Sequence, residues 1–191
     1  MTIAENIARI RANMAAAARE AGRDPKEILL VGASKMNDAA ACREAVAAGI
    51  DALGENRVQE MVQKLEQHAY DGAPLHFIGH LQRNKVKQVV GHVALIQSVG
   101  SLELLDEIEK VAAARGLVQD ILLEVNIGRE AAKSGFAPEK VLPAAEAALE
   151  RTHVRVRGLM TIPPADAQRD ANFRYFQEVQ ALYVDMNQKL F

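Results

Sequence analysis

The chain has 191 residues, of which 49% are hydrophobic and 25% are charged, and its formal net charge is −2. This balance is typical of a soluble folded protein, and it argues against a disordered chain or one strongly attracted to nucleic acid or to a membrane surface. The single cysteine, Cys42, excludes an internal disulfide, as is usual in a reducing compartment.

The first 22 residues predict an amphipathic helix. Thr2 and Glu5 have the spacing of a capping box, and Gly22 is placed to end the helix. Its apolar face consists of Ile3, Ile7, Ile10 and Met14. Charges throughout this segment exclude the apolar core of a secretion signal, so we expect a cytoplasmic protein.

From residue 28 onward, short apolar strands alternate with helical segments. We expect strands at 28–33, 50–53, 75–78, 94–99, 120–128 and 154–162. A helix is expected after each, over roughly 38–48, 57–68, 81–90, 101–116, 138–150 and 167–190. The first of these strands is apolar apart from Gly32, which is typical of a strand buried on both faces.

Six successive βα units predict an α/β fold with a parallel sheet, which is either an open doubly wound sheet or a (β/α)₈ barrel of the TIM type. The turn after the first strand reads GASKMND, which is neither a dinucleotide fingerprint nor a P-loop. We therefore favour a TIM (β/α)₈-type barrel with an extra N-terminal helix. Six units do not close such a barrel, which typically has about 250 residues, so we expect its last strands to be missing from this chain. No linker or repeat is evident, and we expect a single domain over residues 1–191.

Polar residues follow the expected strands at their carboxyl ends, where barrels of this type place their chemistry. They are Ser34 and Lys35, then Glu55 and Asn56, His80 and Gln82, and Gln97 and Ser98 near the end of the fourth strand. The fifth strand itself carries Glu124 and Asn126, and the sixth carries Arg155, Arg157 and Thr161 together with the apolar Met160. A ring of such groups around one rim is typical of a small-molecule site.

Lys35 is the most informative of these residues. A lysine held near apolar walls has its charged form disfavoured, and its free amine can then condense with a carbonyl compound, including pyridoxal phosphate. Two simpler interpretations stay open: Lys35 extends from the strand end into solvent, or it pairs with Glu55.

Five motifs carry a resemblance to a known family. LLVGASKMN, LGENRVQE, LHFIGHLQRNK, LLEVNIGREAAKSGF and VRGLMTIPP, within residues 28–164, resemble in order and spacing the pyridoxal-phosphate homeostasis proteins. These are single-domain barrels similar to the N-terminal domain of bacterial alanine racemase. Together the motifs cover most of the chain and are highly specific.

The resemblance implies pyridoxal 5′-phosphate (PLP) as the cofactor, held as a Schiff base on Lys35. It also implies that Asn56 and His80 line the cofactor pocket and that Met160 packs near the ring. Members of the family are regarded as carriers or regulators of cofactor supply without robust catalysis, so the implied partners are the cofactor itself and PLP-dependent apoenzymes. We expect no nucleic acid, membrane or metal as a partner.

Two other functions remain open. A PLP-dependent amino-acid racemase needs a second acid or base on the opposite face of the cofactor. Tyr70, Tyr175 and Tyr183 all fall in helical or loop segments, which favours binding over catalysis. A cofactor-free barrel in which Lys35 performs aldolase-like carbonyl chemistry is the third alternative.

The family pattern is not matched throughout. In the family, the last helix is followed by a Met-Gly-Met-Ser-type motif and an Arg-(Ile/Val)-Gly-(Ser/Thr)-type strand that form much of the phosphate site, and neither is found here. We therefore expect the chain to be incomplete at its C-terminus. Met36 also departs from the threonine-rich or proline-containing turn of many relatives.

Other charged and reactive residues have simpler interpretations. Glu124 is interpreted as the ion-pair partner of Arg155 or Arg157 on the next strand. Cys42 is interpreted as a small core residue. The basic run at Arg83, Lys85 and Lys87 and the loop residue Lys133 are interpreted as solvated, and the scattered histidines predict no metal site.

Overall fold

The computed structural model describes residues 1–131, 133–165 and 168–190. Within them lie the strands β1 (Val31–Ala33), β2 (Ala52–Glu55), β3 (Leu75–Phe77), β4 (Leu95–Val99), β5 (Gln119–Val125) and β6 (Val154–Thr161). The α-helices are α1 (Ile3–Glu20), α2 (Ala39–Ala47), α3 (Val58–Glu66), α4 (Val86–Val89), α5 (Leu102–Arg115), α6 (Val141–Leu149) and α7 (Arg169–Leu190). Short 3₁₀ turns are η1 (Pro25–Glu27), η2 (Arg83–Lys85) and η3 (Pro138–Lys140).

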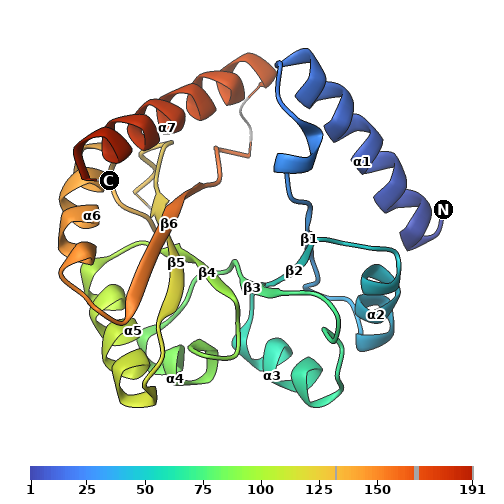
Figure 1. Ribbon diagram of the computed structural model, residues 1–191, viewed down its shortest axis with the longest axis horizontal. Helices are drawn as coiled ribbons and strands as arrows, with labels where there is room; N and C mark the ends of the chain where they lie inside the picture. The colour runs from blue at the N-terminus through green and yellow to red at the C-terminus, as the bar shows by residue number, and fades with distance from the viewer. Residues whose placement is uncertain (132, 166–167, 191) are drawn as a thin grey trace. The chain divides into compact units, whose positions relative to one another are not determined.

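The strands follow one another in the sheet in chain order, β1-β2-β3-β4-β5-β6, with a helix after each (Figure 1). The pairs β1–β2, β4–β5 and β5–β6 are parallel. This sequential parallel order confirms the α/β class and the repeated βα unit of the predicted barrel. Contacts within the chain group it into a first unit, Met1–His76, and a second unit from Phe77 onward. The single-domain expectation stays a prediction.

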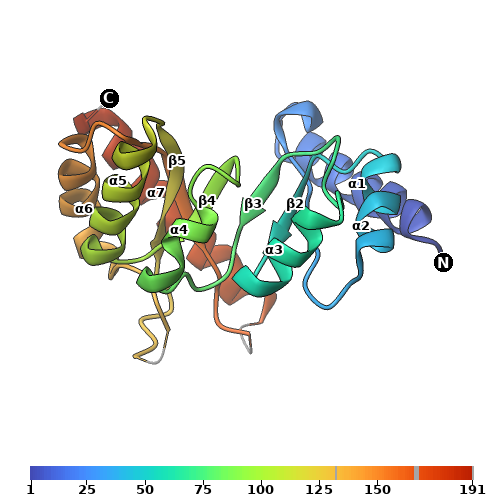
Figure 2. The ribbon, with the colours of Figure 1, turned by 90° about the horizontal axis from the view of Figure 1, so that it is seen from below.

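In the first unit, the predicted N-terminal helix is confirmed. The Thr2 hydroxyl accepts from the Glu5 amide, and the Glu5 carboxylate accepts from the Thr2 amide, which completes the capping box of α1. Helix α1 packs against α2, whose buried Cys42 is a core residue as predicted. Strand β2 is buried along its whole length, and α3 lies beside it (Figure 2).

The first strand is shorter and more exposed than predicted. Residues 28–30 lie outside β1, and the Leu29 side chain is 64% exposed, so the prediction of a strand buried on both faces is wrong. The backbone of this approach segment bonds to a side chain instead of a ladder: the Leu30 amide donates to Asp51 Oδ2 at 2.7 Å. Because β1 stands first in the strand order, it pairs along one edge with β2 alone.

In the second unit, β5 shows a regular alternation that positions the site. Gln119, Ile121, Leu123 and Val125 are buried toward the helices, while Asp120, Leu122, Glu124 and Asn126 alternate with them and are half-buried. The buried face packs with α5 and α6, and α7 adds Tyr175, Val179 and Leu182 around Val125, Ile127 and Val141. Side chains on the other face are therefore available for chemistry.

The pairing of β5 with β6 corrects one prediction. The register places Asp120 opposite Arg155 and Glu124 opposite Met160. Asp120 therefore forms ion pairs with both arginines, at 2.6 Å from Arg155 Nε and 3.7 Å from Arg157 Nε. The predicted pairing of Glu124 with Arg155 or Arg157 is wrong, because the parallel register sets Glu124 four residues further along the strand.

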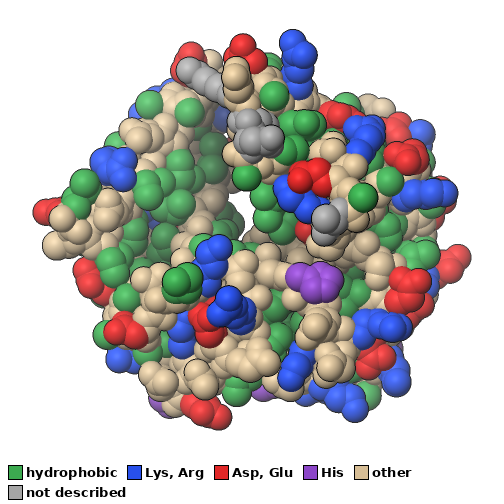
Figure 3. Space-filling view, turned by 180° about the vertical axis from the view of Figure 1, so that it is seen from behind, with side chains coloured by type: hydrophobic (Ala, Val, Ile, Leu, Met, Phe, Trp, Pro, Cys, Tyr) green, Lys and Arg blue, Asp and Glu red, His purple; other side chains and the backbone are tan. Residues whose placement is uncertain are grey.

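Charged side chains of both signs are interspersed over the face displayed in Figure 3, in line with the small net charge. Arg83 and Lys87 of the basic run are exposed, and Lys85 is half-buried. None of the helices in the described part of the chain is long and apolar enough to cross a membrane.

Candidate functional site

A tight turn follows β1 and carries Lys35. The Asn37 amide donates to the Ser34 carbonyl at 3.1 Å, which closes a four-residue turn with Lys35 and Met36 at its centre. Met36 has φ = 63°, in the left-handed region that favours glycine. A bulky residue in this conformation is strained, and such positions persist where the surrounding structure holds them.

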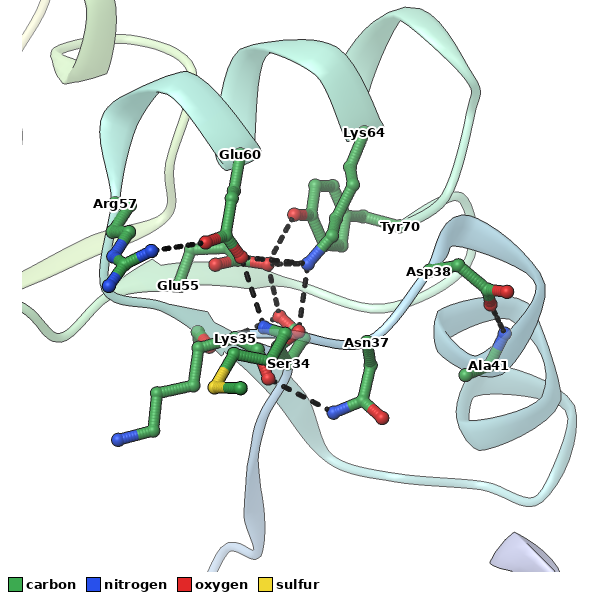
Figure 4. A network of polar contacts seen from close by, with 12 residues as sticks. Ser34, Lys35, Asn37, Asp38, Ala41, Glu55, Arg57, Glu60, Lys64 and Tyr70 are labelled. Carbon is green, nitrogen blue, oxygen red and sulfur yellow. Dashed lines mark hydrogen bonds and ion pairs between the residues drawn. The ribbon is translucent and has the colours of Figure 1, made fainter.

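The side chain of Lys35 is exposed and points away from the polar contacts around it (Figure 4). Its carbonyl accepts from the Asn37 side chain, but among the described residues its amino group has no hydrogen-bond or ion-pair partner. The solvent-facing interpretation therefore holds in the first unit, and the alternative pairing with Glu55 is wrong. The apolar walls expected to shelter this lysine are not found in the described part of that unit.

Glu55 instead pairs with Lys64 in a buried network between α3 and the turn (Figure 4). The Glu55 side chain has no solvent exposure and that of Lys64 is 8% exposed. Glu55 Oε1 accepts from the Lys64 ammonium, from Ser34 Oγ at 2.7 Å and from the Tyr70 hydroxyl at 3.0 Å. Burial, reinforced by the Glu55 carboxylate, raises the pKa of Tyr70, so this hydroxyl keeps its proton and acts as a donor.

Helix α3 also bonds directly to the backbone of the Lys35 turn. Lys64 Nζ donates to the Ser34 carbonyl at 2.8 Å, and the Met36 amide donates to Glu60 Oε2 at 3.1 Å. The Met36 amide bond is the main reason why the pKa of Glu60 is lowered, so Glu60 is an anion at neutral pH. Arg57 and Lys64 lie within ion-pair distance of the same carboxylate.

Asn56 is level with Lys35 at the same end of the sheet. The register pairs Ala33 with Gly54, so Lys35 and Asn56 each lie two residues beyond a matched pair. Asn56 Oδ1 is buried and has no hydrogen-bond partner among the described residues. A buried polar atom without a partner is unusual in a folded protein and fits a position that a ligand completes.

In the second unit, the surroundings of Glu124 on β5 involve both His80 and Met160. His80 is exposed, three residues beyond β3, and it contributes to the electrostatic environment of Glu124. Met160 is half-buried on β6, directly opposite Glu124 in the register. Burial raises the pKa of Glu124, while the Ser134 hydroxyl, 3.1 Å from Oε2, and His80 act in the opposite direction.

A cleft of about 600 Å³ opens beside His80. Its polar lining comes from the segment after β3, from the end of β4 and the start of α5, and from the loop after β5, and includes His80, Arg83, Ser98, Ser101, Glu103 and Ser134. Sequence reasoning missed Ser134, and it placed Glu124 in the ring of strand-end residues but interpreted it as an ion-pair partner of Arg155 or Arg157. The alternation of apolar and polar residues along β5 was the available signal, because it places Glu124 on the face opposite the core.

The structure thus places the predicted residues at the carboxyl ends of their strands, with Lys35 and Asn56 in the first unit and His80 and Met160 in the second. Their role in binding a ligand stays a prediction. In the parts of the chain that are described, no group of three or more His, Cys, Asp or Glu side chains is arranged to hold a metal ion.

Known proteins resemble this chain over nearly its whole length. The family model for the alanine racemase N-terminal domain matches residues 6–190. A pyridoxal phosphate homeostasis protein of Pseudomonas aeruginosa is 40% identical over 186 residues, which cover 97% of this chain and 81% of that protein.

Two solved structures show how the fold is shared. PipY of Synechococcus elongatus with PLP bound superposes with a TM-score of 0.84 at 28% identity, covering 98% of this chain and 83% of PipY. An alanine racemase of Clostridium difficile superposes with a TM-score of 0.72 at 15% identity, covering 84% and 43% of the two chains, and shows the TIM-barrel-type fold alone. The chain belongs to the alanine racemase N-terminal domain family and, within it, to the pyridoxal phosphate homeostasis proteins.

Proposed function

We propose that this chain binds PLP as a Schiff base on Lys35 and acts in PLP homeostasis as a carrier or regulator, without robust catalysis. The observation that carries the proposal is the exposed amine of Lys35, which has no ion-pair partner among the described residues and stands on the turn after β1. The family membership and the PLP-bound structure of PipY support the choice of cofactor.

The chemistry that PLP supplies is an aldehyde that condenses reversibly with an amine. Lys35 would add as the neutral amine to the aldehyde carbon, and one water molecule would leave as a C=N bond replaces the C=O bond. An exposed lysine is accessible to a cofactor that enters and leaves, which suits a carrier better than a permanently enclosed amine would.

Three further residues would hold the cofactor. The unpartnered Oδ1 of Asn56 offers a hydrogen-bond acceptor on the strand next to Lys35. His80 would contribute a polar contact and Met160 an apolar surface beside the ring. The fit to PLP rests on the Asn56 oxygen, because a ligand donor would satisfy an atom that the described chain leaves unpaired.

A PLP-dependent racemase is the alternative from the same fold family. Such an enzyme needs an acid or base that can take a proton from the bound amino acid. Tyr70 lies in the same unit as the Lys35 turn, but its hydroxyl donates to Glu55 and its pKa is raised. This arrangement supports binding over racemisation. PLP-dependent apoenzymes in the cytoplasm are the proposed recipients.

Replacement of Lys35 by alanine tests the proposal. Wild-type protein mixed with PLP is expected to develop the visible absorption of a Schiff base, and borohydride reduction followed by peptide mapping is expected to place the label on Lys35. Lys35→Ala removes the only amine proposed to react and should abolish both signals. Lys110→Ala is the matched control, because Lys110 is also an exposed lysine.

Labelling that persists in Lys35→Ala, or that maps to another lysine in the wild type, would contradict the proposal. Incubation of the PLP-loaded protein with L-alanine, followed by chiral analysis, separates the two functions. Lys35-dependent inversion would establish the racemase alternative, whereas an unchanged enantiomer with a retained Schiff base supports the carrier.

A further inference from the structure

The backbone around Lys35 is bonded on both sides to side chains that lie outside the turn or at its end. Ser34, the residue before it, offers its carbonyl to Lys64 Nζ at 2.8 Å. Met36, the residue after it, donates its amide to Glu60 Oε2 at 3.1 Å. The Lys35 carbonyl itself accepts from Asn37 Nδ2 at 3.1 Å.

We propose that Glu60, together with the buried Lys64–Glu55 pair, acts as a positioning device that fixes the Lys35 turn and so sets the direction in which Lys35 presents its amine to the PLP aldehyde. The inference rests on the proposed function, in which Lys35 is the Schiff-base residue. It adds three residues of α3 and β2 that touch neither the aldehyde nor the Lys35 amine.

The backbone conformation of Met36 supports this role. Its φ of 63° is rarely adopted by a residue with a long side chain, and the side chain itself is 87% exposed, so packing of that side chain does not hold the conformation. The Glu60 carboxylate does hold it, since it takes the Met36 amide as its hydrogen-bond partner. Without Glu60, the turn would lose the contact that favours the strained state.

The burial of Lys64 points in the same direction. A buried ammonium paired with a carboxylate is costly to form, and such pairs are better suited to fixing one geometry than to adding stability. Lys64 bridges Glu55 on β2 and the Ser34 carbonyl, and Ser34 Oγ reaches the same carboxylate oxygen (Figure 4). The end of β1 is thereby tied to β2 and α3 immediately before Lys35. Because the Lys64 ammonium is paired with Glu55, Lys64 does not compete with Lys35 for reaction with the aldehyde.

Loss of this device should slow Schiff-base formation without removing the Lys35 amine. Reaction rates depend steeply on the distance and orientation of the reacting atoms. A displacement of about 1 Å can lower the rate on the order of a hundredfold. In a more mobile turn, the amine is oriented toward a bound aldehyde for a smaller fraction of the time. The rate of reaction with a small reagent that has no binding site on the protein should not depend on that orientation.

The principal test compares Glu60→Ala with Glu60→Gln. The rate of Schiff-base formation with PLP is followed by absorbance and confirmed by borohydride trapping on Lys35. We expect Glu60→Ala to lower the rate on the order of tenfold, while Glu60→Gln, which keeps an oxygen acceptor for the Met36 amide, retains most of it. Glu66→Ala, an exposed glutamate on the same helix, is the matched control and should behave as the wild type.

Acetylation of Lys35 by acetic anhydride, measured by mass spectrometry, is the second readout. If Glu60 acts only by positioning, Glu60→Ala leaves the acetylation rate unchanged, because acetylation depends on the exposure of the amine and not on its orientation. Lys64→Met and its conservative partner Lys64→Arg extend the test to the buried pair. Should Lys64→Met fail to fold, Glu60→Ala still decides, because the Glu60 side chain is partly exposed.

A slow Schiff-base reaction with unchanged acetylation in Glu60→Ala, and recovery in Glu60→Gln, would establish the positioning role. Wild-type rates in Glu60→Ala would overturn it, as would a parallel fall in acetylation, which indicates general loss of structure. Failure of the wild type to react at Lys35 refutes the proposed function and this inference with it. A reacting wild type with unaffected variants refutes the inference alone.

Discussion

The tertiary fold determines which cation pairs with the buried Glu55 carboxylate near Lys35. Glu55 lies at the carboxyl end of β2 with no solvent exposure, and such a carboxylate requires a cation and hydrogen-bond donors. Lys64, Ser34 and Tyr70 supply them. All three bond to Oε1, while Oε2 has no hydrogen-bond partner among the described residues, and the exposed Lys35 amine takes no part in this network.

The contribution of Asp51 to the stability of the folded protein depends on pH. The Arg11 guanidinium, 3.0 Å away, and the Leu30 amide hold the pKa of Asp51 below its usual value. A lowered folded-state pKa contributes stability that is present above the unfolded pKa of about 4 and lost as the pH falls through the folded value. We expect Asp51→Asn to lower the free energy of unfolding by about 1 kcal/mol at pH 7.

The difference between Asp51→Asn and the wild type should shrink toward acid pH, since protonation removes the same interaction. Urea unfolding at pH 7 and below pH 4 measures it. Asp71→Asn is the control, because the Asp71 side chain is 75% exposed. If the free energy of unfolding of Asp51→Asn stays below that of the wild type by the same amount at every pH, the assignment of the lowered pKa to these contacts is contradicted.

At the scale of elements, the loop after β5 is held against the strand by main-chain bonds. The Phe136 amide donates to the Glu124 carbonyl at 2.7 Å, and the Asn126 amide donates to the Phe136 carbonyl at 2.9 Å. These bonds bring Gly135 so close to β5 that a Cβ atom there would lie 2.7 Å from the Asn126 nitrogen. Gly135 also has φ = 110°, which side-chain-bearing residues rarely adopt.

Gly135→Ala is therefore expected to destabilise the protein by about 1–3 kcal/mol or more, through strain and through a clash with backbone. Gly116→Ala isolates the first of these effects, because Gly116 has φ = 64° but no atom within 4 Å of its added Cβ. Denaturant unfolding of both variants measures the difference. Equal losses in the two variants would show that the close approach of the loop to β5 is not rigid.

Periodicity predicts the elements well and their ends less well. All six predicted βα units are confirmed, and β4 and β6 differ from their predicted ranges by one residue at one end. The strand expected at 28–33 begins at Val31 instead, because a run of apolar residues also suits an approach segment whose backbone bonds to Asp51. The second strand begins and ends two residues later than expected, which places Glu55 inside it.

For the whole molecule, the single-domain expectation gives a measurable outcome. A single domain unfolds in one cooperative transition, so hydrogen exchange of peptides from the first and second units should report the same global free energy of opening. Asp51→Asn should lower that value in both units, although Asp51 lies in the first. A loss confined to peptides of the first unit would show that the two unfold separately.

The α/β class, the succession of βα units and the family can be read from the amino-acid sequence, because they depend on local periodicity and on motifs in order along the chain. The sequence also placed Lys35, Asn56, His80 and Met160 at strand ends, where their binding role stays a prediction. Tertiary structure alone decided that Glu55 pairs with Lys64, that Glu124 meets Ser134 and not an arginine, and that Lys35 is exposed. Those outcomes depend on which atoms a register and a helix packing bring within about 3 Å of each other, and spacing in the sequence does not specify such distances.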